Sequence, residues 1–122
     1  MLYQMRLENG QPDPSSSGTW IASNGAATHL RGTDFKMTPI AFWKSKANGA
    51  RYPIGWRVAL PGRQTEFTVK AALEDQELTL GPITYWEGAI DASGMREGKP
   101  IEGRGYLELT GYAGGFREML KR

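Results

Sequence analysis

The 122-residue sequence contains no cysteine and a single histidine, His29. Without cysteine the chain can form no disulfide bond, no reactive thiolate and no cysteine-ligated zinc site. No pair of carboxylates lies at ligand spacing beside His29, so we expect no metal site. A Ser-His-Asp triad would need Ser and Asp to converge on that one histidine. The glycines of Gly103-Arg104-Gly105 lie in a strand pattern rather than in a phosphate-binding loop, and we expect no cofactor.

The chain also lacks an excess of charge and a long apolar run. Fifteen basic and thirteen acidic side chains give a formal net charge of +2, without any basic block. We therefore expect no nucleic-acid partner. No apolar run approaches the roughly 20 residues of a transmembrane helix, and no signal peptide opens the chain. These features predict no transmembrane segment and leave the compartment open.

Helical periodicity is almost absent, and strand patterns replace it. Short runs with alternating apolar and polar residues are separated by glycine, asparagine and proline, which is typical of one antiparallel all-β domain, a barrel or a sandwich. The predicted strands are 1–7, 18–23, 26–30, 33–37, 54–60, 66–73, 85–90 and 103–112, and 76–80 is either a short strand or an irregular extension. Alternation places Trp56 and Val58 on one apolar face of 54–60, and Phe67, Val69 and Leu73 on the inside of 66–73. We interpret 39–52 as irregular, 91–100 as a loop, and 116–120 as a single helical turn.

Two of these strands carry a carboxylate beside aromatic residues. Alternation places Tyr85 and Glu87 on one face of 85–90, and Tyr106, Glu108 and Tyr112 on one face of 103–112. A carboxyl group desolvated among aromatic rings has a raised pKa and can donate a proton near neutral pH. Glu87 and Glu108 are therefore candidate catalytic residues. The alternative is that they pair with arginine, lysine or backbone amides and serve only the structure.

Other side chains extend this set of candidates. Asp75 and Glu77 also lie next to apolar positions. Tryptophan in a small β-domain is more often a core residue than a ligand contact. If Trp20 or Trp43 were exposed as a platform, a carbohydrate-binding domain would be a third interpretation.

Four segments carry a resemblance to a known family. They are Tyr52-Pro53-Ile54-Gly55-Trp56, Asp75-Gln76-Glu77-Leu78, Tyr85-Trp86-Glu87-Gly88, and Gly103-Arg104-Gly105-Tyr106-Leu107-Glu108-Leu109-Thr110-Gly111-Tyr112. In this order they resemble the C-terminal part of the AttH and hydroxyneurosporene synthase (carotenoid 1,2-hydratase) family, often described as predicted secreted hydrolases. The resemblance implies a lipocalin-like barrel or half-barrel with an apolar cavity. It also implies addition of water across an isoprenoid double bond without a cofactor, and a periplasmic or secreted location.

The resemblance further implies that the functional residues are divided between this chain and a segment upstream of it. Family members have another lipocalin-like domain upstream, with an acidic motif and a histidine that this chain does not include. We therefore expect residues 1–122 to be one lipocalin-like domain, the C-terminal portion of a longer protein. The residues implied to contact the ligand are Trp56, Tyr85, Trp86, Tyr106 and Tyr112.

Two functions are consistent with these observations. The first is a domain that binds an apolar polyene, isoprenoid or lipid-like molecule, with hydratase or hydrolase chemistry in the full-length protein. The second is a non-catalytic ligand-binding or assembly module with structural glutamates. Because a partial barrel leaves open sheet edges, we also expect a homo-oligomer, or pairing with an upstream domain of the same protein.

Overall fold

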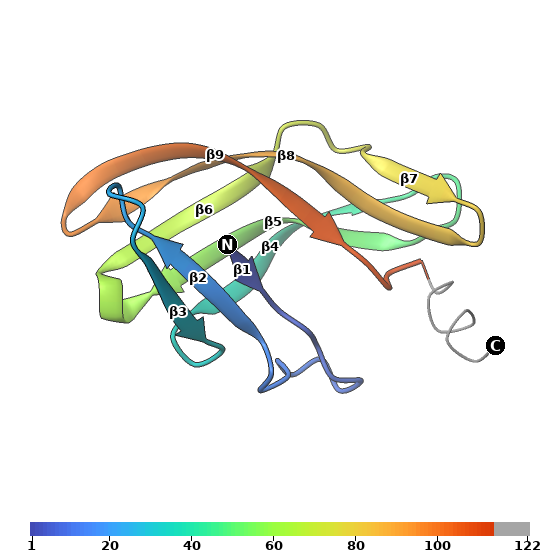
Figure 1. The fold of residues 1–122 in the computed structure, drawn as a ribbon. Helices are drawn as coiled ribbons and strands as arrows, with labels where there is room; N and C mark the ends of the chain where they lie inside the picture. Colours follow the sequence, from blue (N-terminus) through green and yellow to red (C-terminus); the bar gives the residue numbers. More distant parts are fainter. Residues whose placement is uncertain (114–122) are drawn as a thin grey trace.

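The computed structural model describes residues 1–113, which fold into two antiparallel sheets (Figure 1). A short 3₁₀ turn, Pro61–Arg63, follows the fifth strand. The small sheet contains β1 (Leu2–Tyr3), β2 (Ser17–Ile21) and β3 (Ala27–Arg31). The large sheet contains β4 (Lys36–Lys44), β5 (Arg51–Leu60), β6 (Thr65–Ala71), β7 (Glu77–Leu80), β8 (Ile83–Arg96) and β9 (Lys99–Leu109).

The large sheet is organised around the long strand β8. One side of β8 pairs with β9 along its length, and the other side pairs first with β7 and then with β6. The strands β6 and β7 therefore follow one another along the same side of β8. The far side of β9 has no backbone partner within residues 1–113.

The large sheet curves over the small one without closing into a barrel (Figure 1). The fold is an antiparallel lipocalin-like half-barrel, as the sequence predicts. Its core lies between the curved sheet and the small sheet, where Leu30 of β3 and Phe35 join the apolar side chains of β5. On the same side, the guanidinium groups of Arg63 and Arg96 lie 4.7 and 4.8 Å from the ring centroid of Trp20 in β2. These cation–π contacts connect the two sheets.

The faces predicted from alternation are confirmed for the central strands. Trp56 and Val58 of β5 lie opposite Val69 and Phe67 of β6 on the inner face, which faces the small sheet. Along β8 and β9, the even-numbered residues of β8 and the odd-numbered residues of β9 share this inner face. Tyr85 and Glu87 therefore lie on the outer face, whereas Trp86, between them in the sequence, lies on the inner face.

The prediction of a loop over 91–100 is wrong. Strand β8 continues to Arg96, β9 begins at Lys99, and only Glu97 and Gly98 form the turn. Their φ angles of 50° and 78° are typical of the tight hairpin turns that match the twist of paired strands. Pro100 is tolerated because β9 is an edge strand and a proline nitrogen facing away from β8 costs no ladder hydrogen bond.

Other boundaries also differ from the prediction. Residues 39–52 are mostly strand, because β4 extends to Lys44 with a bulge at Ile40, and β5 begins at Arg51. Strand β6 ends at Ala71, so Leu73 is exposed rather than inside. The helical turn predicted at 116–120 lies outside the described residues. Residues 1–113 contain no helix with the length and apolarity that crossing a membrane requires.

Candidate ligand groove and a hydrogen-bonded carboxylate

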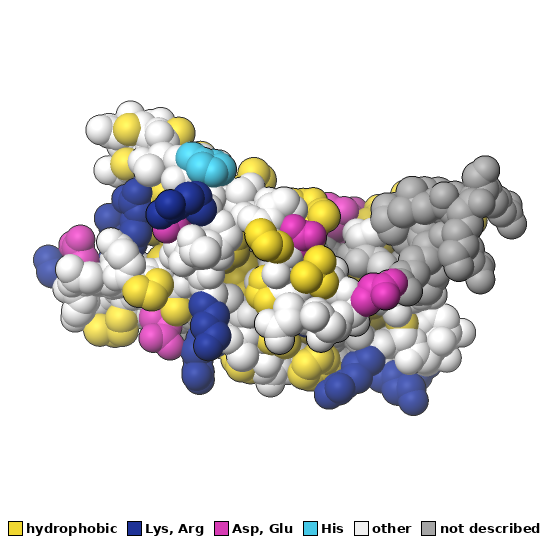
Figure 2. Space-filling view, turned by 90° about the horizontal axis from the view of Figure 1, so that it is seen from below, with side chains coloured by type: hydrophobic (Ala, Val, Ile, Leu, Met, Phe, Trp, Pro, Cys, Tyr) yellow, Lys and Arg dark blue, Asp and Glu magenta, His cyan; other side chains and the backbone are white. Residues whose placement is uncertain are grey.

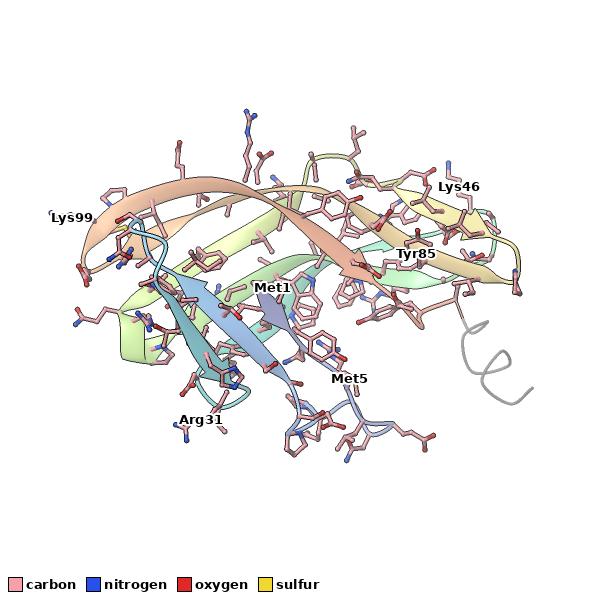
Figure 3. The ribbon with its side chains drawn as sticks, viewed as in Figure 1. Met1, Met5, Arg31, Lys46, Tyr85 and Lys99 are labelled. Carbon is pink, nitrogen blue, oxygen red and sulfur yellow. The ribbon has the colours of Figure 1, made fainter. Side chains whose placement is uncertain are left out.

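An apolar groove of about 420 Å³ follows the inner face of the large sheet. It exists because the inner positions near the β9 edge are small: Ala92 of β8 and Gly103 and Gly105 of β9 leave space between larger neighbours. Leu2 of β1 and the preceding Met1, which is labelled in Figure 3, border the groove from the side of the small sheet. The larger apolar side chains that line it include Met37, Trp56, Val58, Phe67, Val69, Ile90, Ile101 and Leu107.

The polar groups of this groove are few and lie at its rim. The indole nitrogen of Trp56 donates to the carbonyl oxygen of Pro53 at 2.8 Å, and the guanidinium group of Arg6 lies 5.0 Å from the centroid of the Trp56 ring, which also lines the groove. Glu102 and Arg104 line the groove from β9, but their register places both side chains on the outer face of the sheet. The groove is therefore suited to an apolar ligand.

The face that carries the small sheet also exposes apolar side chains. Figure 2 shows hydrophobic side chains in the middle of this face, with lysine and arginine side chains around them. The exposed large hydrophobic residues of the first 31 positions include Met1, Tyr3, Met5 and Ile21.

The sequence-predicted ligand residues are divided between the two faces. Trp56 lines the groove. Trp86 lies in the core with no exposed surface, and its indole nitrogen donates to the carbonyl oxygen of Glu74 at 2.7 Å. Tyr85 and Tyr106 lie on the outer face, where Tyr106 is 65% exposed.

Tyr112 does not share the face of Tyr106, contrary to the prediction. Strand β9 ends at Leu109, and Gly111 takes a φ of 94°, which turns the chain back toward the core. The ring of Tyr112 lies 5.9 Å from that of Tyr52, and it packs against the core. Burial raises the pKa of Tyr112.

Glu87 and Glu108 lie directly opposite each other on the outer face. The hydroxyl group of Tyr85 donates to Glu87 at 3.4 Å, and Thr110 donates to Glu108 at 3.5 Å. Partial desolvation, together with the charge of Glu87, raises the pKa of both Tyr85 and Tyr106. Like charges opposite each other destabilise a sheet, and neither carboxylate points into the groove.

A different carboxylate, Glu77, has the most hydrogen-bond partners. Its two oxygens accept from the hydroxyl groups of Tyr52 at 2.6 Å and Ser45 at 2.7 Å, and from the side-chain amide of Asn48 at 3.1 Å. Tyr52 and Ser45 are buried. The start of β5 pairs with β4, but its pairing with β6 begins only at Gly55, and on that side the carboxylate joins β5 to β7.

Sequence reasoning singled out Glu77 only as one carboxylate among four. Its partners lie 25 to 32 residues away along the chain, so no local pattern indicates them. A polar hollow of about 340 Å³ adjoins it, bordered by Trp43, Ser45 and Asp75. Residues 1–113 contain no group of three or more His, Asp and Glu side chains that could hold a metal ion.

The hydrogen bonds of Glu77 shift its own pKa and that of Tyr52. Partial burial by itself would raise the pKa of Glu77, but the donors Tyr52, Ser45 and Asn48 together outweigh it, so this pKa lies below its usual value. Burial, and then the hydrogen bond to Glu77, raises the pKa of Tyr52. Glu77 is therefore ionised at neutral pH and Tyr52 is protonated, which is the state that a stabilising hydrogen bond needs.

This arrangement predicts an acid-dependent loss of stability. Because the pKa of Glu77 is lower in the folded than in the unfolded state, its contribution is complete above its unfolded value near 4.5 and is lost as the pH falls through the folded value. Thermal unfolding at pH 7 and pH 4 should show a smaller loss of Tm in Glu77→Gln than in the unmodified protein.

Two variants complete this test. Glu66→Gln, on the outer face where Glu66 lies 3.7 Å from Arg57, is the matched control and should keep the acid dependence of the unmodified protein. Tyr52→Phe should lower Tm at pH 7 by about 5 °C, as expected for a loss of about 1 kcal/mol. Equal acid dependence in Glu77→Gln and Glu66→Gln would contradict the role given to Glu77.

Comparison with protein families matches residues 1–112 to the family described as AttH-like. Among solved structures, the chain is similar to an AttH protein from Nitrosomonas europaea, with 31% identity and a TM-score of 0.74 over 89% of this chain and 33% of that one. It is also similar to kievitone hydratase from Nectria haematococca, with 24% identity and a TM-score of 0.73 over 94% of this chain and 35% of that one. The chain thus spans about a third of the length of each. The search of curated proteins found no match.

Proposed function

This chain belongs to the AttH-like family, and we propose that its half-barrel binds an apolar polyene, isoprenoid or lipid-like molecule in the groove of the inner face. The observation that carries the proposal is the groove itself. Its walls are aliphatic and aromatic, and its volume of about 420 Å³ lies within the usual range of small-molecule pockets. A ligand in contact with Trp56, Phe67 and Ile90 would be stabilised by removal of apolar surface from water.

We propose binding, without catalysis, as the part that residues 1–113 perform. Protonating an alkene requires an acid within hydrogen-bond reach of the ligand. Glu87 and Glu108 project from the outer face, and Glu77 is ionised and holds Tyr52 and Ser45. Hydratase or hydrolase chemistry would need groups from elsewhere in a longer protein. The coverage of about a third of each solved relative supports our proposal that 1–122 is one domain of such a protein.

The second candidate is an assembly module with structural glutamates. The hydrogen bonds of Glu77 favour it, because they join β7 to the start of β5 and occupy both carboxylate oxygens. A carbohydrate platform is less well supported. Trp20 lies between two guanidinium groups and Trp43 stacks on Tyr52 with ring centroids 6.0 Å apart, and both side chains are half-buried.

Filling the groove tests the proposal. A Cβ at Gly103 meets no atom within 4 Å, so Gly103→Leu can extend its side chain into the groove without displacing the protein. Binding of cis-parinaric acid, a fluorescent polyene fatty acid, should weaken at least about tenfold, because the new side chain takes the place of the ligand. The readout is the dissociation constant from a fluorescence titration.

Gly62→Leu provides the matched control. Gly62 also has open space at its Cβ, but it lies in the 3₁₀ turn rather than in the groove, so binding should not change. Glu87→Gln and Glu108→Gln, on the outer face, should leave binding unchanged as well. Equal affinity for the probe in Gly103→Leu and Gly62→Leu would place any binding outside the groove. No binding by the unmodified protein would favour the assembly module.

A further inference from the structure

Strand β9 is a long, regular sheet edge. It pairs with β8 over residues 99–109 without a register shift, whereas β4, another outer strand of the large sheet, is interrupted by a bulge at Ile40. Bulges are one of the means by which proteins prevent an edge from pairing with another chain. The edge of β9 has no bulge, and its one proline, Pro100, lies at the end of the strand beside the turn.

The register shows which backbone groups of β9 are free to pair. Arg96 and Lys99 flank a two-residue turn and form a hydrogen-bonded pair, so the odd-numbered residues of β9 bond to β8. The N–H and C=O groups of Glu102, Arg104 and Tyr106 point away from β8. Within residues 1–113 no backbone hydrogen bond reaches them.

The side chains along this edge carry opposite charges at alternate positions. Glu102 and Arg104 lie on the outer face, two residues apart, and the only ion pair of Arg104 in the described part of the chain is a 3.9 Å contact with Asp91 between exposed side chains. Lysine and inward-pointing charges also protect an edge, but the one lysine of β9, Lys99, lies at the turn and outside the centre of the edge. This alternation instead makes the edge complementary to a second copy of itself.

We propose that two copies of this chain associate by antiparallel pairing of β9 with β9, centred on Gly103. In that register Glu102 lies opposite the partner's Arg104, and Arg104 lies opposite the partner's Glu102. Pro100 has no N–H to donate to the partner, but it lies opposite the partner's Tyr106 and covers an aromatic ring that is 65% exposed in the single chain. Opposite charges and aromatic contacts across neighbouring strands are stabilising.

Other registers are less favourable. Shifting the centre to Glu102 or Arg104 opposes like charges at the centre, and a centre on Gly105 opposes Glu102 with the partner's Glu108. A centre on Tyr106 opposes Arg104 with the partner's Glu108, but it overlaps only residues 103–109, against 99–107 for the proposed register. The longer overlap favours Gly103. The inference depends on the edge of β9 and not on the proposed ligand.

Charge reversal tests the proposal. Sedimentation of the full chain without ligand, over a range of concentrations, should show a monomer–dimer equilibrium. Glu102→Arg and Arg104→Glu should each weaken it at least about tenfold, because each opposes like charges across the pair. A 1:1 mixture of the two variants should associate again, since the heterodimer opposes arginine with glutamate at both positions. The double variant Glu102→Arg/Arg104→Glu should also associate.

A control variant and the contradicting outcomes complete this test. Glu66→Arg reverses a charge on the outer face of an interior strand and should leave association unchanged, and circular dichroism should show that all variants are folded. A monomer at all concentrations, or dimers insensitive to both single reversals, would overturn the proposal. Failure of the double variant to associate would overturn the Gly103 register, because in the Tyr106 register the glutamate introduced at position 104 faces the partner's Glu108. Since no ligand is present, these results are independent of the groove experiment.

Discussion

Replacing Trp86 by alanine should lower the free energy of unfolding by about 3–5 kcal/mol, the cost of removing a fully buried tryptophan. Trp86 has no exposed surface, lies opposite Leu109 of β9 and Glu77 of β7, and packs in the core. Its removal would also leave the carbonyl oxygen of Glu74 without the hydrogen bond at 2.7 Å. Domains have a total stability of only about 5–15 kcal/mol, so much of the margin would be lost.

Chemical denaturation followed by circular dichroism measures this effect. Trp86→Phe is the conservative variant, and it should cost less because it keeps most of the apolar contact and loses mainly the indole hydrogen bond. Tyr85→Ala, at the neighbouring position on the outer face, is the matched control and should have a smaller effect. If Trp86→Ala weakened ligand binding while leaving the unfolding transition unchanged, Trp86 would be a ligand contact rather than a core residue.

The second large effect is expected at Gly94. This residue lies on the inner face of β8, opposite Phe67 of β6. A Cβ at Gly94 would lie 2.5 Å from the Cα and 2.7 Å from the Cβ of Phe67, and still closer to the carbonyl oxygen of Glu66. Two of these three atoms belong to the backbone, so a rotamer change in a flexible side chain cannot remove the overlap. Gly94→Ala should therefore destabilise the fold by roughly 1–3 kcal/mol.

Gly103→Ala is the control for this prediction. Gly103 lies on the inner face of the adjacent strand, and an added Cβ meets nothing within 4 Å. Alanine restricts the unfolded chain more than glycine, so Gly103→Ala should be neutral or slightly stabilising. Urea denaturation of both variants makes the comparison. Equal stability of Gly94→Ala and Gly103→Ala would show that β6 adjusts to the added atom without cost.

Much of the fold could be predicted because strand faces follow a period of two. The inner face of β5, with Trp56 and Val58, and that of β6, with Phe67 and Val69, are visible in the alternation of the sequence. Asn24-Gly25 is a local signal for a hairpin turn, and β2 and β3 do pair around it, with a φ of 87° at Gly25. These features depend on neighbouring residues only.

The boundaries that could not be predicted have a different cause. Residues 91–96 contain alanine, serine and glycine, which have weak strand propensity, yet they form strand because β6 and β9 pair with them on both sides. Similarly, Pro39 did not prevent a strand at the edge of the sheet. Pairing between distant segments outweighed the local preference of these residues.

The residues of the candidate site also separate into features that the sequence determined and features that only the tertiary structure decided. The sequence by itself determined the antiparallel β class, the AttH-like family, and which residues share a face of each strand, because alternation and motifs are local properties. Only the tertiary structure decided that Glu87 and Glu108 lie on the outer face and that Trp86 is a core residue. It also decided that Glu77 meets Tyr52, and that small residues leave a groove beside β9. A face becomes inner or outer only when a second layer packs against it, and that contact joins residues far apart in the chain.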